Sequence, residues 1–441
     1  MARIKLAYIG GGSTRAAGTM ASFIAQGEHF NGSEIVLIDL NEEHLTIVQT
    51  IARKLARARG LDLTITTTTD RRAGLRDCDA VLTSYRPGGF EARHLDESIP
   101  LKHGIIGQET QGPGGFFMAL RSIAVMQDII ADMEAVCPRA RLFNYTNPIN
   151  IISEAVTHHS AIPTISFCEG PIMDAARFAR YAGLDPTRLS VRFRGLNHGS
   201  WGINPRYDGQ DFLPLLEETY ERLRRQHPKG EEESADPELR YTLRQLRLAI
   251  TMQALPNHYL QYYYYKDELL AELQAKPTTR AQDIMASVPD YWAHYREQAE
   301  QDVPALDPAR SRGGLHELEL AIDVMDAIYN DRGELWYVNV PNQGAIPGLP
   351  DDRVVELVGY ADRHGVTPLV HEPLPAHLRG LINQLAEYQA LTAEAAWRGN
   401  RRDAIRALAS HPLVLSLSKA EALYDEMAAA HRAYLPERLL R

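Results

Sequence analysis

The feature that most constrains the fold of this chain is a glycine turn placed directly after a short apolar run. Residues 4–10 read IKLAYIG and are followed by Gly11, Gly12 and Ser13. The apolar run predicts a buried strand, and the glycines permit a sharp turn into a helix. A second apolar run, EIVLIDL at 34–40, carries Asp39 near its end, 29 residues past Gly10. This order of elements predicts the first unit of a doubly wound parallel sheet.

Four more apolar runs continue the alternation of strand and helix through the first half of the chain. They lie at 61–69, 79–85, 140–146 and 163–169, and helical patterns occupy 41–59 and 114–136. Most of the runs are nearly continuous in hydrophobicity, as is typical of parallel strands that are covered on both faces. The sequence therefore predicts an α/β fold with an N-terminal Rossmann-type sheet.

The second half has a different pattern, and we expect it to form a mixed α+β, largely helical domain. Long helical patterns lie at 237–250 and 378–412, a polar, proline-bounded loop or insertion lies at 226–238, and a last strand pair is predicted within 334–350. We place the boundary between two domains, 1–195 and 196–441, where the two patterns meet.

Length, charge and cysteine content exclude several classes of protein. The 441 residues suffice for two cores, and a net charge of −10 disfavours a nucleic-acid or anionic-membrane surface. No run of eighteen apolar residues occurs, and the N-terminus reads as a strand rather than a signal peptide. Three cysteines are too few for a disulfide framework. We expect a cytoplasmic protein that binds no nucleic acid and no membrane.

The glycine turn and the acid together predict a dinucleotide site. Gly10 and Gly12 match the first two glycines of the dinucleotide fingerprint, whereas Arg15 occupies the third glycine position. Glycines let the backbone approach a pyrophosphate, and an acid at the end of the second strand binds the adenosine ribose and favours NAD over NADP. The predicted NAD⁺-binding residues are Gly10, Gly11, Gly12, Ser13 and Asp39.

Two further residues allow two interpretations when they are taken by type alone. Cys168 lies in ISFCEGP at 165–171, and His198 lies in GLNHGSWG at 195–202. Residues of these types are more often a small core cysteine and a hydrogen-bonded loop histidine. Together they also form two ligands of the kinds that bind a transition metal.

Six motifs make the chain resemble a known family. They are RPGGFEARHLDESIPLKHGIIGQETQGPGGFFMALRSI (86–123), NYTNP (144–148), GLNHG (195–199), PNHYLQYYYY (256–265), TTRAQDIM (278–285) and VNVPNQGAIPGLPDD (338–352). In this order they resemble glycoside hydrolase family 4, the NAD- and divalent-metal-dependent glycosidases, and most of all its 6-phospho-β-glucosidase branch. This family is an exception to the paired-carboxylate mechanism that most sugar hydrolases use.

The resemblance implies a redox-assisted mechanism and assigns its residues. NAD⁺ takes a hydride from carbon 3 of the sugar, a base removes the proton on carbon 2, the aglycone leaves carbon 1, water adds, and the hydride returns. Cys168 and His198 are then the ligands of Mn²⁺ or a similar divalent ion. Tyr259 is the expected base, with Tyr262 and Tyr263 as alternates.

The resemblance also implies residues that contact the substrate. Arg93, Glu109 and Asn147 are expected sugar contacts, and Arg280 is expected to bind a 6-phosphate, with help from Ser13. Glu169 departs from the family, which carries Asn at this position in 6-phospho-β-glucosidases and Asp in 6-phospho-α-glucosidases as the leaving-group acid. The anomeric preference therefore stays open, with the β anomer favoured by the other motifs.

The sequence leaves other functions open beside this one. A 6-phospho-α-glucosidase or an unphosphorylated glycoside hydrolase would use the same residues. A dehydrogenase of the lactate or malate type shares the N-terminal architecture, but it would turn over NAD⁺ without a metal. A non-catalytic sugar-phosphate sensor would need neither Tyr259 nor the metal ligands. Related enzymes assemble as dimers or tetramers, and we expect a homodimer or homotetramer here.

Overall fold

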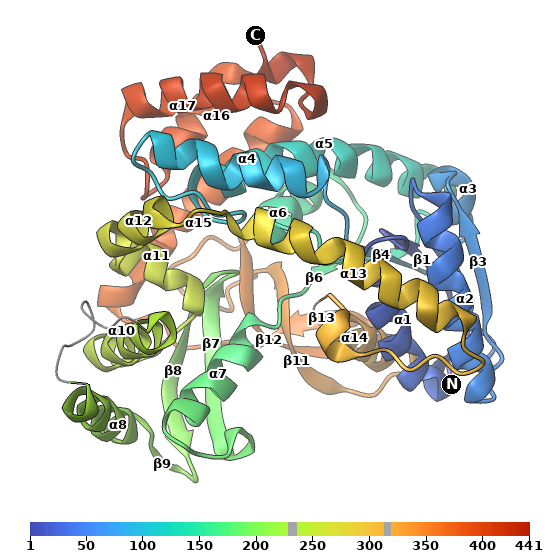
Figure 1. Ribbon diagram of the computed structural model, residues 1–441, viewed down its shortest axis with the longest axis horizontal. Coiled ribbons are helices and arrows are strands. Elements are labelled where there is room, and N and C mark those ends of the chain that lie inside the picture. Colours follow the sequence, from blue (N-terminus) through green and yellow to red (C-terminus); the bar gives the residue numbers. More distant parts are fainter. Residues whose placement is uncertain (228–235, 313–318) are drawn as a thin grey trace.

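The computed structural model describes residues 1–227, 236–312 and 319–441 (Figure 1). The strands of its first half are β1 (Lys5–Ile9), β2 (Glu34–Ile38), β3 (Thr64–Thr68), β4 (Ala80–Thr83), β5 (Arg141–Asn144) and β6 (Thr164–Ser166). All six pair in parallel, in the order 3-2-1-4-5-6. Each lies within an apolar run read from the sequence, and the predicted doubly wound sheet is confirmed.

Helices connect these strands and cover both faces of the sheet. They are α1 (Ala16–Ala25), α2 (Glu42–Ala58), α3 (Arg71–Leu75), α4 (Gly89–Lys102), α5 (Gly112–Val136), α6 (Ile149–His159) and α7 (Gly170–Tyr181). Helix α2 shows why such segments fold locally. The Asn41 side chain accepts a hydrogen bond from the His44 amide. Glu42 and Glu43 occupy the first turn, where the positive end of the helix dipole stabilises their negative charges.

The strands of the second half extend the same sheet rather than forming a separate one. They are β7 (Leu189–Leu196), β8 (Gly199–Tyr207), β9 (Gln210–Asp211), β10 (Leu255–Pro256), β11 (Glu334–Pro341), β12 (Val354–Asp362) and β13 (Gly365–Pro368). Strand β11 pairs antiparallel with β6, and the sheet continues through β12, β7, β8 and β10. Because one sheet crosses the proposed boundary, the division at 195/196 stays a prediction.

The predicted strand pair within 334–350 is wrong in its second member. Strand β11 occupies its first part, but the antiparallel partner of β11 is β12, which starts at Val354. Residues 342–350 form a loop instead, since the Asn342 side chain accepts from the Ile346 amide and donates to the Ile346 and Leu349 carbonyls. The hairpin of β7 and β8 around His198 was also not expected as a strand pair.

The helices of the second half confirm its mixed character. They are α8 (Leu213–Gln226), α10 (Pro237–Met252), α11 (Gln261–Tyr264), α12 (Lys266–Ala275), α13 (Arg280–Glu300), α14 (Glu319–Tyr329), α15 (Ala376–Trp397), α16 (Arg401–Ser410) and α17 (Leu417–Ala430). The single pattern at 378–412 divides into α15 and α16, because Asn400 begins a new helix with a capping box. Of the loop predicted at 226–238, residues 228–235 lie outside the described residues; Gln226 ends α8, and Pro237 and Glu238 begin α10.

Helix α5 is the central core helix of the first half. It is long and apolar enough to cross a membrane, but 72% of its most apolar window is buried inside the protein. Its buried side chains include Phe116, Phe117, Leu120 and Ile123, which belong to one hydrophobic cluster with residues of α15, α16 and α17. The burial therefore accounts for the apolar character of α5.

A buried ion cluster attaches the C-terminal helices to this core. Arg121 of α5 donates two hydrogen bonds to Asp96 of α4, at 2.9 and 2.6 Å. His431, directly after α17, lies 3.0 Å from the same carboxylate, and all three side chains are buried. Arg121 and His431 therefore both depend on the single carboxylate of Asp96 in α4.

We expect Asp96→Ala to lower the free energy of unfolding by about 3–5 kcal/mol, because it leaves the buried Arg121 charge without its carboxylate. Asp425→Ala is the matched control, since Asp425 pairs with Arg401 at the surface and its loss should cost at most about 1 kcal/mol. Urea unfolding followed by circular dichroism measures both. Equal midpoints for the two variants would contradict this role of Asp96.

Candidate active site

The glycine turn lies between β1 and α1, as the sequence predicts. Gly10 has φ +99°, and a Cβ built on it would stand 2.1 Å from the carbonyl oxygen of Ser84. A side chain is therefore excluded at this position. The Gly12 amide donates to Asp39 Oδ2 at 2.9 Å, so the acid at the end of β2 supports the turn itself. Ser13 is half-buried in the same turn, and its amide donates to the Gly10 carbonyl.

Cys168 and His198 lie side by side although 30 positions separate them. Cys168 follows β6, and His198 occupies the turn between β7 and β8 with φ +61°. Cys168 Sγ and His198 Nε2 are 3.6 Å apart. A tetrahedral metal ion with ordinary metal–sulfur and metal–nitrogen bonds holds such atoms about 3.6 Å apart. Within the described residues no third cysteine, histidine or carboxylate joins the pair to form a three-ligand cluster.

The orientation and charge of the His198 ring suit a ligand. His198 Nδ1 lies 2.9 Å from Thr110 Oγ1, and the Thr110 hydroxyl donates to Gln108 Oε1 at 2.9 Å. This chain places the ring proton on Nδ1 and leaves the Nε2 lone pair directed at Cys168. Burial, reinforced by the nearby His258, lowers the pKa of His198 to about 3, so the ring is neutral at neutral pH. Thr110 was not predicted, and the only signal for it in the sequence is its position next to Glu109.

A buried carboxylate holds the turn that carries His198. Glu356, the third residue of β12, accepts from Asn197 Nδ2 at 3.0 Å and from Ser200 Oγ at 2.7 Å. Burial raises the pKa of Glu356 to about 7, and burial together with the Glu356 charge raises the pKa of the Cys168 thiol. Glu356 was not predicted, although an acid inside the apolar strand VVELVGY needs buried partners and is a usable signal.

Tyr259 is the tyrosine of its run that contacts this pair. Its ring stacks on the His198 ring with centroids 3.7 Å apart. Tyr262 lies instead near Glu97 and Arg93, and the Tyr263 hydroxyl donates to Gln111 Oε1. Burial, together with the Glu109 charge, raises the pKa of Tyr259 well above its ordinary value. A positive charge beside the phenol is therefore needed before it can act as a base near neutral pH.

Asp174 fixes the short helical turn that carries Tyr259. This buried carboxylate of α7 accepts from the His258 amide at 3.0 Å and lies 3.0 Å from His258 Nδ1. The His258 ring is tilted against the Tyr259 ring with centroids 4.1 Å apart. Neither Asp174 nor His258 was predicted, although His258 directly precedes Tyr259 in the chain.

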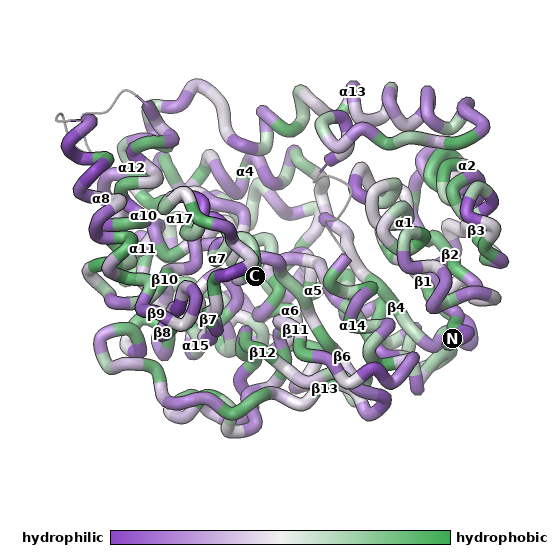
Figure 2. The backbone as a smooth tube through the Cα atoms, turned by 90° about the horizontal axis from the view of Figure 1, so that it is seen from below, coloured by the Kyte–Doolittle hydropathy of each residue, from purple (hydrophilic) through white to green (hydrophobic). Residues whose placement is uncertain are grey.

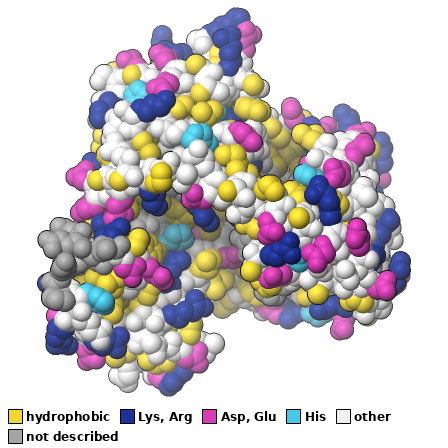
Figure 3. Space-filling view, in the orientation of Figure 1, with side chains coloured by type: hydrophobic (Ala, Val, Ile, Leu, Met, Phe, Trp, Pro, Cys, Tyr) yellow, Lys and Arg dark blue, Asp and Glu magenta, His cyan; other side chains and the backbone are white. Residues whose placement is uncertain are grey.

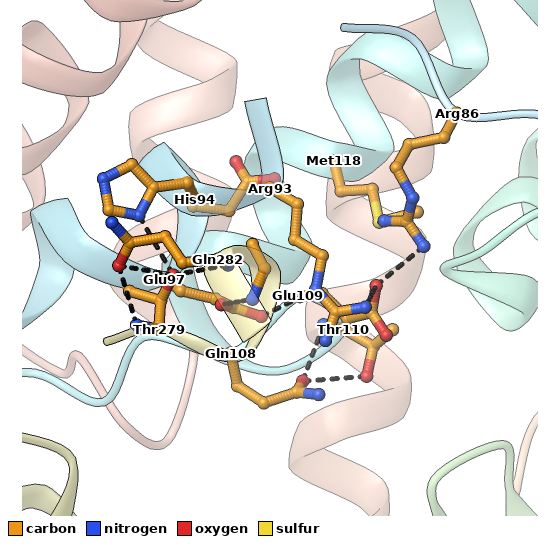
Figure 4. A network of polar contacts seen from close by, with 12 residues as sticks. Arg86, Arg93, His94, Glu97, Gln108, Glu109, Thr110, Met118, Thr279 and Gln282 are labelled. Carbon is orange, nitrogen blue, oxygen red and sulfur yellow. Dashed lines mark hydrogen bonds and ion pairs between the residues drawn. The ribbon is translucent and has the colours of Figure 1, made fainter. Parts of the chain in front are cut away.

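Arg93 and Glu109 form a buried cluster with arginines that were not predicted. Glu109 lies 2.8 Å from both Arg86 and Arg93 (Figure 4). Burial opposes ionisation of Glu109, but the Arg86, Arg93 and Arg312 charges outweigh it and lower its pKa to about 2. Burial and the Arg15 and Arg86 charges lower the pKa of Arg312 to about 9. Cations exceed carboxylates in this cluster, which favours an anionic ligand.

The remaining predicted residues differ in how closely they join this group. Asn147 follows β5, and its Oδ1 is buried with no hydrogen-bond partner among the described residues. Glu169 follows Cys168 at the start of α7, where it accepts from the Tyr145 hydroxyl at 3.4 Å. Arg280 is exposed at the first residue of α13. The adjacent Ala281 amide donates to Glu97 Oε2, and Glu97 binds Arg93, which links Arg280 to the cluster.

These residues gather where the parallel strands of the first half end. Gly10, Arg86, Asn147 and Cys168 follow β1, β4, β5 and β6, and carboxyl ends of parallel strands share one edge of a sheet. Figure 3 shows the molecule hollowed between its lobes on this face, with basic and histidine side chains visible in the walls of the hollow. Open α/β sheets bind their ligands in such a crevice.

Comparison with known proteins identifies the family. Residues 5–184 match the family described as "Family 4 glycosyl hydrolase", and residues 193–414 match its C-terminal domain. The chain is 33% identical over 448 residues to the 6-phospho-β-glucosidase of Escherichia coli (strain K12), and the match covers 98% of this chain and 96% of the relative.

Solved structures agree over nearly the whole chain. The 6-phospho-β-glucosidase of Thermotoga maritima with NAD and glucose-6-phosphate has a TM-score of 0.83 at 26% identity, and the match covers 98% of this chain and 99% of the other. A 6-phospho-α-glucosidase from gut microorganisms with NAD and Mn²⁺ has a TM-score of 0.84 at 26% identity and the same coverage.

A more distant likeness concerns the fold alone. Malate dehydrogenase of Plasmodium falciparum has a TM-score of 0.52 at 11% identity over 90% of this chain. The dehydrogenase-like architecture expected from the sequence is thereby confirmed. The motifs, the two matched domains and the full-length relatives agree: this chain belongs to family 4 of the glycosyl hydrolases, enzymes that cleave glycosidic bonds.

Proposed function

We propose that this enzyme hydrolyses 6-phosphoglucosides, with preference for the β anomer, and that it uses NAD⁺ and a divalent cation such as Mn²⁺. The observation that carries this proposal is the 3.6 Å approach of Cys168 Sγ and His198 Nε2 beside Tyr259. The E. coli relative is a 6-phospho-β-glucosidase, and the similar structures contain NAD, glucose-6-phosphate or Mn²⁺.

The glycine turn fits a dinucleotide. A Cβ would stand 2.1 Å from the Ser84 carbonyl oxygen at Gly10 and 3.0 Å from the Asp39 side chain at Gly12, so both positions require glycine. The turn opens directly into α1, whose first N–H groups suit a pyrophosphate. Asp39 lies at the end of β2, where an acid accepts hydrogen bonds from the adenosine ribose. We assign Gly10, Gly11, Gly12, Ser13 and Asp39 to NAD⁺.

The thiol and imidazole fit a catalytic metal ion. Cys168 and His198 would supply two ligands and leave positions for sugar hydroxyls and water. When bound, NAD⁺ accepts and later returns the hydride of carbon 3, and the cation stabilises negative charge on the neighbouring sugar oxygen. The Nδ1–Thr110 contact keeps the His198 ring in the ligand tautomer throughout.

Tyr259 and Glu169 are the proposed proton-transfer groups. Tyr259 removes the proton on carbon 2, because among the tyrosines of its run it stacks against the metal-binding histidine. Glu169 donates a proton to the departing aglycone oxygen, because it adjoins Cys168 at the open end of β6. The Tyr145 hydroxyl holds the Glu169 carboxylate in place.

The cationic cluster supports a phosphorylated substrate. Arg93, Glu109 and Asn147 are the proposed sugar contacts, and Asn147 offers an Oδ1 whose hydrogen-bonding capacity the described protein groups leave free. Arg280 is the proposed 6-phosphate contact, next to a cluster whose net charge favours anions, and Ser13 stays with the NAD⁺ group in the glycine turn. A 6-phospho-α-glucosidase is the second candidate, because the α and β structures are equally similar in sequence, at 26% each.

The cellular setting and assembly rest on the sequence and on related enzymes. We propose a cytoplasmic enzyme that assembles as a homodimer or homotetramer, with residues 1–195 binding NAD⁺ and residues 196–441 contributing substrate, metal and subunit contacts. Size-exclusion chromatography with light scattering measures the assembly.

Nitrophenyl 6-phosphoglucosides of both anomers test the function directly. We expect release of nitrophenol only with NAD⁺, Mn²⁺ and a reductant together, faster with the β anomer, and without net formation of NADH. Absorbance at separate wavelengths follows nitrophenol and NADH. Accumulation of NADH in proportion to product would instead indicate a dehydrogenase, and cleavage without NAD⁺ would refute the redox mechanism.

Removal of either metal ligand tests the metal site. We expect Cys168→Ala and His198→Ala each to weaken Mn²⁺ binding at least about tenfold and to abolish hydrolysis, while NAD⁺ binding persists. Cys137→Ala is the control, because Cys137 is buried at the end of α5. Isothermal titration calorimetry measures the affinities for Mn²⁺ and for NAD⁺. Unchanged Mn²⁺ affinity in the two ligand variants would overturn the assignment.

The phosphate contact is tested by substrate comparison. We expect Arg280→Ala to raise KM for the phosphorylated substrate about tenfold or more, because it removes a charged hydrogen bond, and to leave KM for the unphosphorylated analogue nearly unchanged. Lys276→Ala, an exposed cation shortly before α13, controls for general charge effects. Equal changes for both substrates would mean that Arg280 does not bind phosphate.

A further inference from the structure

Helix α13 joins two parts of the site that the chain places far apart. It runs from Arg280 to Glu300, a length of about 30 Å, and contacts α4 at one end and α2 at the other. Figure 1 shows it crossing the front of the molecule, and Figure 2 shows it along one side, with its far end beside α2. A helix from the second half of the chain thus covers the nucleotide half.

The far half of α13 holds the glycine turn from outside. The Tyr295 hydroxyl donates to the Thr14 carbonyl at 2.8 Å, and the Tyr295 side chain is fully buried. Trp292, one turn earlier, stacks on His44 with ring centroids 3.6 Å apart and an interplanar angle of 15°. The His44 ring lies next to the backbone of Gly12. Tyr295 therefore binds the Thr14 end of the segment Gly12–Thr14 directly, and Trp292 packs against its Gly12 end through His44.

Further contacts fix this end of α13 to α2. Arg296 donates to Glu43 Oε1 at 2.7 Å, and Lys54 Nζ donates to the Ala299 carbonyl at 2.8 Å and to the Gln301 carbonyl at 2.7 Å. Lys54 therefore binds carbonyls at the C-terminus of α13, where a cation is favoured. These contacts with α2 hold in place the part of α13 that carries Tyr295 and Trp292.

The near end of α13 is attached to the sugar side of the site. The Ala281 amide donates to Glu97 Oε2 at 2.8 Å, and Glu97 Oε1 accepts from Arg93 Nε at 2.7 Å. Figure 4 shows Glu97 with Arg93, and Thr279 and Gln282 of the helix start beside Glu97 and His94. A displacement of Arg93 or Glu97 is therefore transmitted to α13.

We propose that Tyr295 and Trp292 are positioning residues for the nucleotide turn, and that α13 couples nucleotide binding to sugar-phosphate binding. The inference rests on the proposed function, since it takes the glycine turn as the NAD⁺ site and the Arg93 cluster as the sugar side. Neither side chain needs to touch a ligand. Each acts by keeping the Gly12–Thr14 backbone in the binding conformation before the nucleotide arrives.

The physical reason is the conformational freedom of glycine. A turn with three consecutive glycines loses more backbone entropy on ordering than a turn of other residues, and Gly10 holds a positive φ. Contacts that order the turn in advance remove this cost from the binding step and increase affinity. By the same reasoning, a sugar phosphate that immobilises Arg93 also stiffens α13, and linkage then requires each ligand to strengthen the binding of the other.

Tyr295→Phe is the direct test, because it deletes one hydroxyl and keeps the ring. We expect Kd for NAD⁺ and for AMP to rise about tenfold, the effect of losing one buried hydrogen bond worth about 1.4 kcal/mol. Kd for glucose 6-phosphate, titrated with Mn²⁺ and without nucleotide, should change less than about twofold. Tyr291→Phe is the matched control, since this half-buried tyrosine of the same helix makes no hydrogen bond through its hydroxyl to a described residue.

Coupling is tested with AMP, because it occupies only the adenosine end and does not reach the sugar. In the wild-type chain we expect saturating glucose 6-phosphate to lower Kd for AMP about threefold or more, and in Tyr295→Phe and Trp292→Leu we expect this effect to disappear. Thermal unfolding of the unliganded variants confirms that they fold. If Trp292→Leu does not fold, His44→Ala removes the same ring stack from the opposite side and takes its place.

The outcomes distinguish a failure of this inference from a failure of the proposed function on which it rests. A wild-type chain that binds neither AMP nor NAD⁺ would overturn both. Normal nucleotide binding by Tyr295→Phe would overturn the positioning role and leave the proposed function standing. An equal loss of affinity for AMP and for glucose 6-phosphate would show a general structural defect, and it would also overturn the positioning role.

Discussion

The buried carboxylate of Glu356 is the group on which the geometry of this site depends. It lies in β12, between β11 and the hairpin that carries His198, and it binds Asn197 and Ser200, one residue before and two residues after that histidine. A non-glycine residue in the left-handed region costs about 1–2 kcal/mol, and His198 adopts that conformation. The two hydrogen bonds to Glu356 offset this cost and hold the imidazole against the thiol.

Burial suppresses the ionisation of three side chains in the site. His198 is neutral because its pKa is lowered, while the Cys168 thiol and the Tyr259 phenol are held protonated because their pKa values are raised. A cation between them favours the thiolate and the phenolate, since both carry negative charge. The arginines around Glu109, which line the same crevice, favour a negatively charged ligand instead. The same pocket is thus prepared for a cation at one end and an anion at the other.

The parts that the sequence predicted are local. The strands around Gly10 and Asp39 follow from continuous apolar runs, and the turn follows from glycine at a position where a Cβ would collide with Ser84. Arg86, Thr110 and Arg312 were missed because their role arises from pairing across distant segments. Glu356 was missed although an acid in an apolar strand is a usable signal. The second strand of the 334–350 prediction failed because Asn342 closes a loop there and delays the partner strand to Val354.

By itself, the sequence determined a parallel sheet of six strands, a glycine turn at the end of the first, and the family motifs that carry Cys168, His198 and Tyr259. Only the tertiary structure decided that the second half extends this sheet, that Tyr259 rather than its neighbours stacks on His198, and that α13 crosses back to the glycine turn. Hydrophobic period and backbone sterics act between near neighbours, so a sequence displays them directly. Ring stacking and buried hydrogen bonds join residues far apart in the chain, and their partners are fixed only when the layers pack.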